Sequence, residues 1–178
     1  VASGAYTPPG ATAPVDVPAF CRVTGVVKPA VRFEVWLPMD GWNGKFHVSG
    51  NGGMAGVISY GGLANALNRG YAAASTDTGH VRPGTGGFDA SWALGRPDLV
   101  TDFGHRALHV TTEAGKAITR GYYERPPDHS YYTGCSKGGQ QGLMAAQRYP
   151  DDFDGIIAGN PAHDWTRFYA GAHLWYAL

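Results

Sequence analysis

The chain contains 178 residues, with 14 basic (Lys and Arg) and 14 acidic (Asp and Glu) residues, so its formal net charge is zero. This length predicts one domain with a substantial core. The balanced charge argues against nucleic acid as a partner, because no basic excess exists to release counterions. The 27 glycines form no regular repeat, which excludes collagen-like and helical-bundle folds. No apolar run is long enough to span a membrane, and the N-terminus lacks the basic and apolar regions of a signal peptide, so any such peptide is expected to have been removed or never to have existed.

Residues 1–20 contain four prolines among small residues and are predicted to form an extended arm. Residues 21–178 have an even composition, so we predict one unit without an internal boundary. Apolar patterns predict strands at 31–38, 45–49, 71–76, 130–135 and 155–158, helices at 63–69, 98–120 and 138–149, and a Gly/Pro-rich loop at 81–97. Strands that alternate with helices indicate an α/β fold with a mostly parallel sheet and flanking helices.

The motif with the clearest chemistry is Gly134-Cys135-Ser136-Lys137-Gly138, which fits the G-x-S-x-G pattern between a predicted strand and a predicted helix. In a nucleophile elbow, this sharp turn exposes the serine hydroxyl at the end of a sheet, and glycines are needed where the chain approaches itself. Ser136 is therefore the predicted nucleophile. The alternative is a serine in an ordinary strand-to-helix turn.

A glycine-rich stretch, Gly50-Asn51-Gly52-Gly53, follows an earlier predicted strand. Ester hydrolysis needs two backbone N–H donors for the oxyanion, one from the residue after the nucleophile and one from a loop after an early strand. These would be the N–H of Lys137 and the N–H of Gly52 or Gly53. The Lys137 side chain is expected to be solvated.

The segment TGCSKGGQQGLMAAQRYPDDFDGIIAGNPAHDW (133–165), together with GYAAASTDTGH (70–80), ALHVTTEAGKAI (107–118) and the tyrosine pair at 122–123, resembles the tannase and feruloyl esterase family of α/β-hydrolases. The resemblance covers residues 21–178, and its specific mark is Cys135, directly before the serine. It implies an α/β-hydrolase fold of which this chain is the N-terminal part, with the lid and the C-terminal strands absent.

The resemblance also implies a disulfide that clamps Cys135 to a cysteine after the catalytic histidine, outside this chain, and a partner for Cys21 upstream of residue 1. On counting alone, Cys21 and Cys135 could instead pair with each other. A disulfide framework implies a secreted or periplasmic protein. The acid and the histidine of the triad are expected beyond residue 178, since such folds place them after the serine. The chain itself implies no cofactor, although the family's lid often carries a structural calcium.

Other residues of the chain are weaker candidates for the site. His163 and His173, with Asp154 and Asp164, follow Ser136, but the residues between leave too few strands for a base to reach the serine. His80 lies in a loop where it could line the site, although a hydrogen-bonded loop histidine beside Asp77 is the preferred interpretation. His105 and His109 have a metal-binding spacing but no evident third ligand, and Trp36, Trp42 and Trp92 are expected to pack structurally.

The predicted activity is hydrolysis of carboxylic esters through an acyl-enzyme on Ser136. The resemblance implies a small aromatic ester as substrate, of gallate, ferulate or other hydroxycinnamates, or a terephthalate half-ester. It also implies that the remainder of the same enzyme, its lid and C-terminal segment, is this chain's partner. The alternatives are a polyester or other carboxylesterase of the same fold, and a catalytically inactive fragment or binding module.

Overall fold

The computed structural model describes residues 1–81, 87–168 and 171. Its elements in chain order are β1 (Gly4–Tyr6), β2 (Val15–Val17), β3 (Phe20–Val27), β4 (Val31–Pro38), β5 (Lys45–Ser49), α1 (Tyr60–Asn68), β6 (Ala72–Thr76), η1 (Ser91–Ala93), α2 (Pro97–Thr101), η2 (Asp102–Arg106), α3 (Ala107–Tyr123), β7 (His129–Cys135), α4 (Lys137–Arg148), η3 (Pro150–Asp152) and β8 (Gly155–Gly159). The predicted Gly/Pro-rich loop at 81–97 contains η1, and its residues 82–86 lie outside the described residues.

A six-stranded sheet in the order β3-β4-β6-β5-β7-β8 forms the centre of the molecule. Strands β6, β5, β7 and β8 run parallel to one another, which confirms the predicted mostly parallel α/β fold. β3 and β4 instead form an antiparallel hairpin, and β4 also pairs antiparallel with β6. Because the four parallel strands all point the same way, their carboxyl ends meet at one edge of the sheet.

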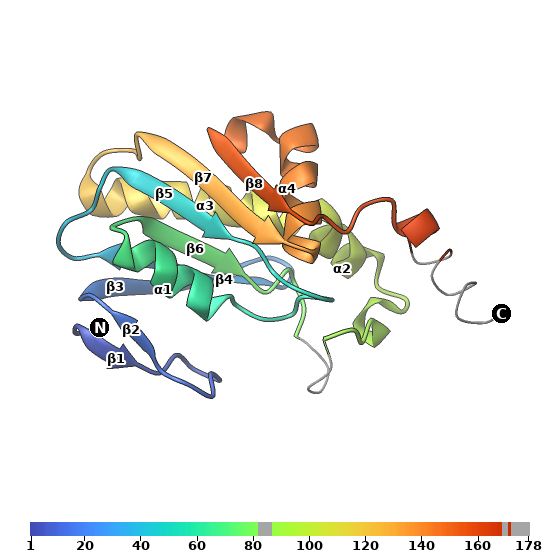
Figure 1. Cartoon of the computed structure of the whole chain (residues 1–178), viewed down its shortest axis with the longest axis horizontal. Coiled ribbons are helices and arrows are strands. Elements are labelled where there is room, and N and C mark those ends of the chain that lie inside the picture. Colours follow the sequence, from blue (N-terminus) through green and yellow to red (C-terminus); the bar gives the residue numbers. More distant parts are fainter. Residues whose placement is uncertain (82–86, 169–170, 172–178) are drawn as a thin grey trace.

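Helices cover both faces of this sheet, with α1 on one face and α3 and α4 on the other (Figure 1). On the α1 face, Trp36 and Ala73 pack with Leu63 and Leu67 of the helix. On the opposite face, residues of the strands pack with the two larger helices in a second cluster that includes Val35, Phe46, Val48, Leu108, Tyr132 and Ala145. The strands therefore alternate their side chains between two apolar layers, as a sheet buried on both faces requires.

The first twenty residues are more ordered than an extended arm. β1 and β2 pair antiparallel, and Val17 and Phe20 are buried beside Trp36. β3, which begins at Phe20, was not predicted from the sequence. It lies at an edge of the sheet, where half-exposed side chains and Gly25 weaken the apolar pattern.

The predicted helix at 98–120 is present, but it is not α-helical throughout. It consists of α2, a π-helical turn (η2) and α3, which continues to Tyr123. A π-helical turn accommodates one extra residue and changes the direction of nearby carbonyls. The carbonyls of Phe103 and Gly104, both in η2, accept hydrogen bonds from side chains of α4. No helix in the described part of the chain is long and apolar enough to cross a membrane.

Candidate active site

Ser136 lies at the junction of β7 and α4, where the parallel strands end. Its backbone has φ 59° and ψ −115°, a left-handed conformation that a serine adopts at a cost of about 1–3 kcal/mol. The residue is exposed to solvent, although its neighbour Lys137 is fully buried. The sharp turn thus places the hydroxyl at the surface of the carboxyl edge, which is the geometry of a nucleophile elbow.

The glycines around Ser136 are required by close packing. A Cβ on Gly134 would lie 2.6 Å from the carbonyl carbon of Gly138, and a Cβ on Gly139 would overlap the carbonyl oxygen of Gly159. The Ser136 N–H donates to the Gly159 carbonyl (3.0 Å), so β8 also holds the turn. The elbow is therefore fixed from both sides by backbone contacts that no larger residue permits.

The backbone N–H of the first residue of α4 takes no part in the hydrogen bonds of that helix. Lys137 is the N1 residue, and its N–H has no intrahelical acceptor, as is true of every first helical turn. Within residues 1–81 and 87–168, the N–H of Lys137 donates to no protein acceptor. The helix dipole adds partial positive charge at this end. A negative oxygen beside Ser136 would be stabilised by both effects.

The glycine-rich loop after β5 lies beside the elbow. The Gly50 N–H donates to the Thr133 carbonyl at 2.9 Å, and the Asn51 N–H donates to Gln141 Oε1 at 3.0 Å. The Asn51 side chain donates to the carbonyls of Val57 and Thr76, both at 2.8 Å. The pairing of Asn51 with Gln141 could not be predicted from the sequence, because the two residues are 90 positions apart and only the fold brings them together.

Gly52 and Gly53 follow this fixed point. Gly52 is exposed, and a Cβ placed on it would meet nothing within 4 Å. Gly53 has φ 56°, and a Cβ on it would overlap the Gly87 carbonyl oxygen. Among the described residues, neither N–H donates to a protein acceptor.

The Lys137 side chain is buried rather than solvated, so the expectation from the sequence is wrong. Its exposed fraction is 1%, and its ammonium donates to the Phe103 carbonyl and to Gln140 Oε1. Burial lowers the pKa of Lys137 to about 7. A lysine is normally assumed to be solvated, and the sequence gives no indication of the carbonyl in η2 that accepts its hydrogen bond.

His80 is buried below the glycine-rich loop. Its Nε2 forms a hydrogen bond with the Met54 carbonyl (2.7 Å), and its ring stacks on Trp92 at 3.8 Å between centroids. The preferred interpretation of His80 as a hydrogen-bonded loop histidine agrees with these contacts. Burial also raises the pKa of the adjacent Asp77 to about 6, against the lowering effect of backbone N–H donors from Gly79 and Arg32.

The in-chain acid and base candidates do not form a triad with Ser136. Asp154 accepts from the Ser130 N–H, near the start of β7, so it lies at the opposite edge of the sheet from the elbow, about 20 Å away at ~3.3 Å per strand residue. The His163 ring is exposed and bonds locally to the Pro161 carbonyl, and Asp164 pairs with Arg167. His173 lies outside the described residues.

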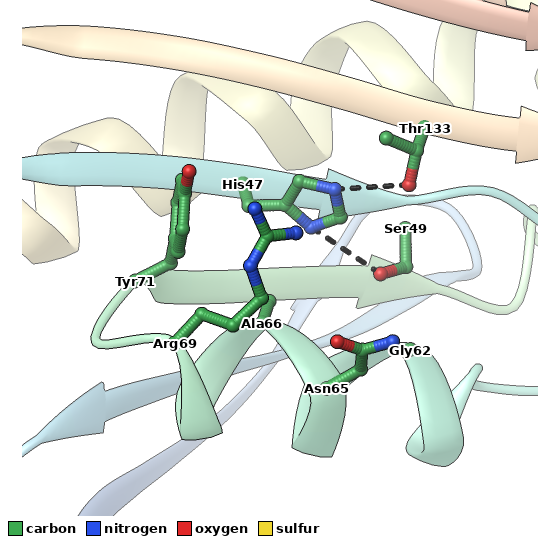
Figure 2. Close-up of a pocket in the computed structure, with 8 residues that line it drawn as sticks. All are labelled: His47, Ser49, Gly62, Asn65, Ala66, Arg69, Tyr71 and Thr133. Carbon is green, nitrogen blue, oxygen red and sulfur yellow. Dashed lines mark hydrogen bonds between the residues drawn. The ribbon is translucent and has the colours of Figure 1, made fainter.

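Away from the elbow, a serine and a histidine lie close together on the α1 face of the sheet (Figure 2). The His47 ring lies between Thr133 Oγ1 (3.0 Å) and Ser49 Oγ (3.4 Å), beside a cavity of about 90 Å³ that Arg69 and Tyr71 also line. Burial, with a smaller contribution from the Arg69 charge, lowers the pKa of His47 to about 4. Ser49 is buried and no carboxylate contacts His47 in the described part of the chain, so this pair lacks the third member of a triad.

The helical histidines are structural. His105 Nδ1 lies 2.8 Å from the Tyr149 hydroxyl, and His109 Nδ1 lies 2.9 Å from Asp152. Among the residues that the structure describes, no three His, Cys, Asp or Glu side chains gather in a way that could hold a metal ion. The tryptophans also pack, since Trp36 is fully buried and Trp42 stacks on Tyr123.

Cys21 and Cys135 are both free in this structure. They lie on β3 and β7, which are four strand positions apart in the sheet. At about 4.8 Å per strand, that separation is far beyond the ~7 Å Cα distance that a disulfide can span. The pairing of Cys21 with Cys135 is therefore excluded in this fold, whereas Cys135 is exposed next to Ser136.

The fold and the elbow together define part of an α/β-hydrolase. The family model of tannase and feruloyl esterase matches residues 15–178. The chain therefore belongs to the tannase and feruloyl esterase family, a family of carboxylic ester hydrolases.

Individual relatives agree with this assignment. An uncharacterized esterase of Xanthomonas campestris pv. campestris is 46% identical over 170 residues, which cover 93% of this chain and 29% of the relative. The crystal structure of an esterase from Aspergillus oryzae superposes with a TM-score of 0.88 at 31% identity, covering 99% of this chain and 36% of the other. Feruloyl esterase B from Aspergillus oryzae gives a TM-score of 0.79 at 34% identity, covering 93% and 33%. The chain thus spans about a third of the length of each of these three proteins.

Proposed function

We propose that the full-length protein carrying these residues is a serine esterase that hydrolyses esters of aromatic acids through an acyl-enzyme on Ser136. The observation that carries the proposal is the left-handed backbone of Ser136 at an exposed strand-to-helix turn, beside amides without acceptors. Left-handed non-glycine residues of this kind are retained where function requires them.

In the proposed reaction, a histidine outside this chain takes the Ser136 proton, and the serine oxygen attacks the ester carbonyl carbon. The Lys137 N–H and the N–H of Gly52 or Gly53 donate to the oxyanion that forms. The alcohol leaves with a proton from the histidine, and water then repeats the same steps on the acyl-enzyme. The acid that orients the histidine is also assigned to a region outside these residues, because Asp154 and Asp164 are held by other partners.

The aromatic character of the substrate is supported by the family and by feruloyl esterase B among its structural relatives. Gallate and hydroxycinnamate esters are the proposed substrate class. The choice among them is assigned to a lid outside this sequence, as is any structural calcium.

The remainder of the full-length protein is the proposed partner of this chain. β8 lies at an edge of the sheet, and the side chain of Ile157 in the middle of this strand is 68% exposed. Large apolar side chains and open strand edges are usually covered, so we expect the remainder of the protein to pack here. We also propose that Cys135 forms its disulfide with a cysteine from that remainder, next to the catalytic histidine, and that the protein is secreted or periplasmic.

Labelling of the full-length protein with a fluorophosphonate probe tests the proposal. We expect one covalent adduct on Ser136, its loss in Ser136→Ala, and its retention in Ser49→Ala, which removes the serine beside His47. An adduct that survives Ser136→Ala, or no adduct on a folded protein, would refute the mechanism. A panel of aromatic and short aliphatic esters then tests substrate class, since a preference for aliphatic esters would favour a polyester or general carboxylesterase.

A further inference from the structure

The Lys137 side chain is directed beneath the elbow, away from the reaction side. Its Nζ lies 2.8 Å from the Phe103 carbonyl oxygen and 3.6 Å from the centroid of the Phe103 ring, and it also donates to Gln140 Oε1. Within the described residues, no carboxylate lies within 4 Å of this ammonium. Burying a lysine without a counter-ion costs free energy. This cost suggests that the buried side chain has a role that a solvated lysine could not perform.

The partner of Lys137 is the π-helical turn η2. Gln140, three residues further along α4, reaches the same turn through the Gly104 carbonyl. Two side chains of the first turn of α4 therefore bind successive carbonyls of η2. π-helical turns expose backbone groups that an α-helix would use internally, and they occur frequently at functional sites.

The other side of Phe103 contacts residues that hold the glycine-rich loop. Its ring lies 5.1 Å from Trp92 and 6.0 Å from His80 between centroids, and His80 bonds to the Met54 carbonyl in that loop. The cluster of Phe103, Trp92 and His80 thus connects the Lys137 side chain on one side to Met54, directly after the glycine-rich stretch, on the other.

We propose that the Lys137 side chain is a positioning residue for the esterase reaction, because it fixes the first turn of α4 on η2 and so sets the direction of its own backbone N–H toward the oxyanion. The inference rests on the proposed function. Hydrogen bonds to an oxyanion depend strongly on geometry, and small misplacements in an active site reduce rates by about 100-fold. The substrate does not contact this side chain.

The test compares Lys137→Met with Lys116→Met in the full-length protein. Lys116 is the matched control, because its ammonium donates to the Asp152 carbonyl and lies 6.0 Å from the centroid of the Phe153 ring, away from the elbow. For Lys137→Met, we expect kcat to fall about 10- to 100-fold with KM within about twofold of the wild type. Lys116→Met should retain the wild-type kcat. An unchanged kcat in Lys137→Met, or equal losses in both variants, would overturn the proposal.

Two further measurements keep the inference separate from folding and from the proposed function. Gln140→Met removes one acceptor and the contact to Gly104 with little change in volume, so a smaller loss of kcat, of several-fold, is expected even if Lys137→Met does not fold. Amide hydrogen exchange reports the elbow directly, and Lys137→Met should speed exchange at the hydrogen-bonded amides of Ser136 and Gln140 relative to Lys116→Met. If the wild type hydrolyses no ester, the proposed function fails, while unchanged exchange in a folded Lys137→Met variant would refute the positioning role independently.

Discussion

Gly138 packs so closely against Asn51 that a Cβ on the glycine would lie 2.9 Å from the Asn51 carbonyl oxygen. This contact joins the first turn of α4 to the glycine-rich loop, and therefore joins the two segments that carry the proposed oxyanion donors. Asn51 is held in turn by Gln141 of the same helix through both its backbone N–H and its side-chain oxygen. The spacing between the loop and the elbow is thus set by a glycine and a buried amide pair.

Gly138→Ala should separate the loop from the elbow. Alanine normally stabilises a helix relative to glycine by about 1 kcal/mol, but here the methyl group would overlap backbone and should cost about 1–3 kcal/mol. We expect kcat/KM to fall at least about tenfold, measured with an aromatic ester. Gly121→Ala in α3 is the control, since its added methyl group meets nothing within 4 Å, and it should be neutral or stabilising. Wild-type activity in Gly138→Ala would contradict this prediction.

Ser136→Gly should stabilise the protein while abolishing activity. The φ of 59° is unfavourable for serine and accessible to glycine, so the substitution should raise the free energy of unfolding by about 1 kcal/mol. Ser136→Ala removes the same hydroxyl without relieving the backbone and should show no such gain. Chemical denaturation of both variants measures the difference. Equal stabilities would mean that the elbow stores no strain.

The burial of His47 predicts a loss of stability in acid. Its pKa is lowered from about 6.5 to about 4 in the folded protein, so the unfolded chain binds the proton more readily. The contribution is fully present above pH 6.5 and is lost as the pH falls from about 6.5 to about 4, by at most about 3 kcal/mol. Unfolding free energies at pH 7 and pH 4.5 should therefore differ less in His47→Gln than in the wild type. The exposed His163→Gln variant should keep the wild-type difference.

Peptide mapping without reduction should find no Cys21–Cys135 bridge in the full-length protein, because the sheet holds β3 and β7 four strand positions apart. We expect Cys135 to be linked to a cysteine outside these residues. Cys135→Ser should lower both the melting temperature and kcat, since the proposed bridge holds the nucleophile near its base. A free thiol at Cys135 in the oxidised protein would contradict the disulfide.

The elbow could be predicted from the sequence because its chemistry is local: the serine, its glycines and the flanking strand and helix are contiguous. The strand at 31–38 was equally clear, since it is buried along almost its whole length and its bounds match β4. In contrast, β3 was not predicted, because it is an edge strand whose half-exposed side chains and Gly25 weaken its apolar pattern.

The environment of Lys137 could not be predicted, because it depends on contacts between distant segments. Its acceptor is 34 residues away, in a turn whose one extra residue leaves the apolar periodicity of residues 98–120 nearly unchanged. Asn51 and Gln141 were missed for the same reason. Local patterns thus predicted the turn and its serine, whereas the residues that hold this turn in place became visible only in the folded chain.

The common direction of β5, β6, β7 and β8 has a consequence for protein engineering. The glycine-rich loop after β5 and the elbow after β7 are fixed by close backbone contacts. The segments that follow β6 and β8 leave the sheet at the same edge and can be lengthened or exchanged without repacking either apolar layer, because the layers are completed by residues within the strands and helices. Libraries aimed at new acyl groups should therefore confine diversity to these connections and leave the scaffold sequence constant.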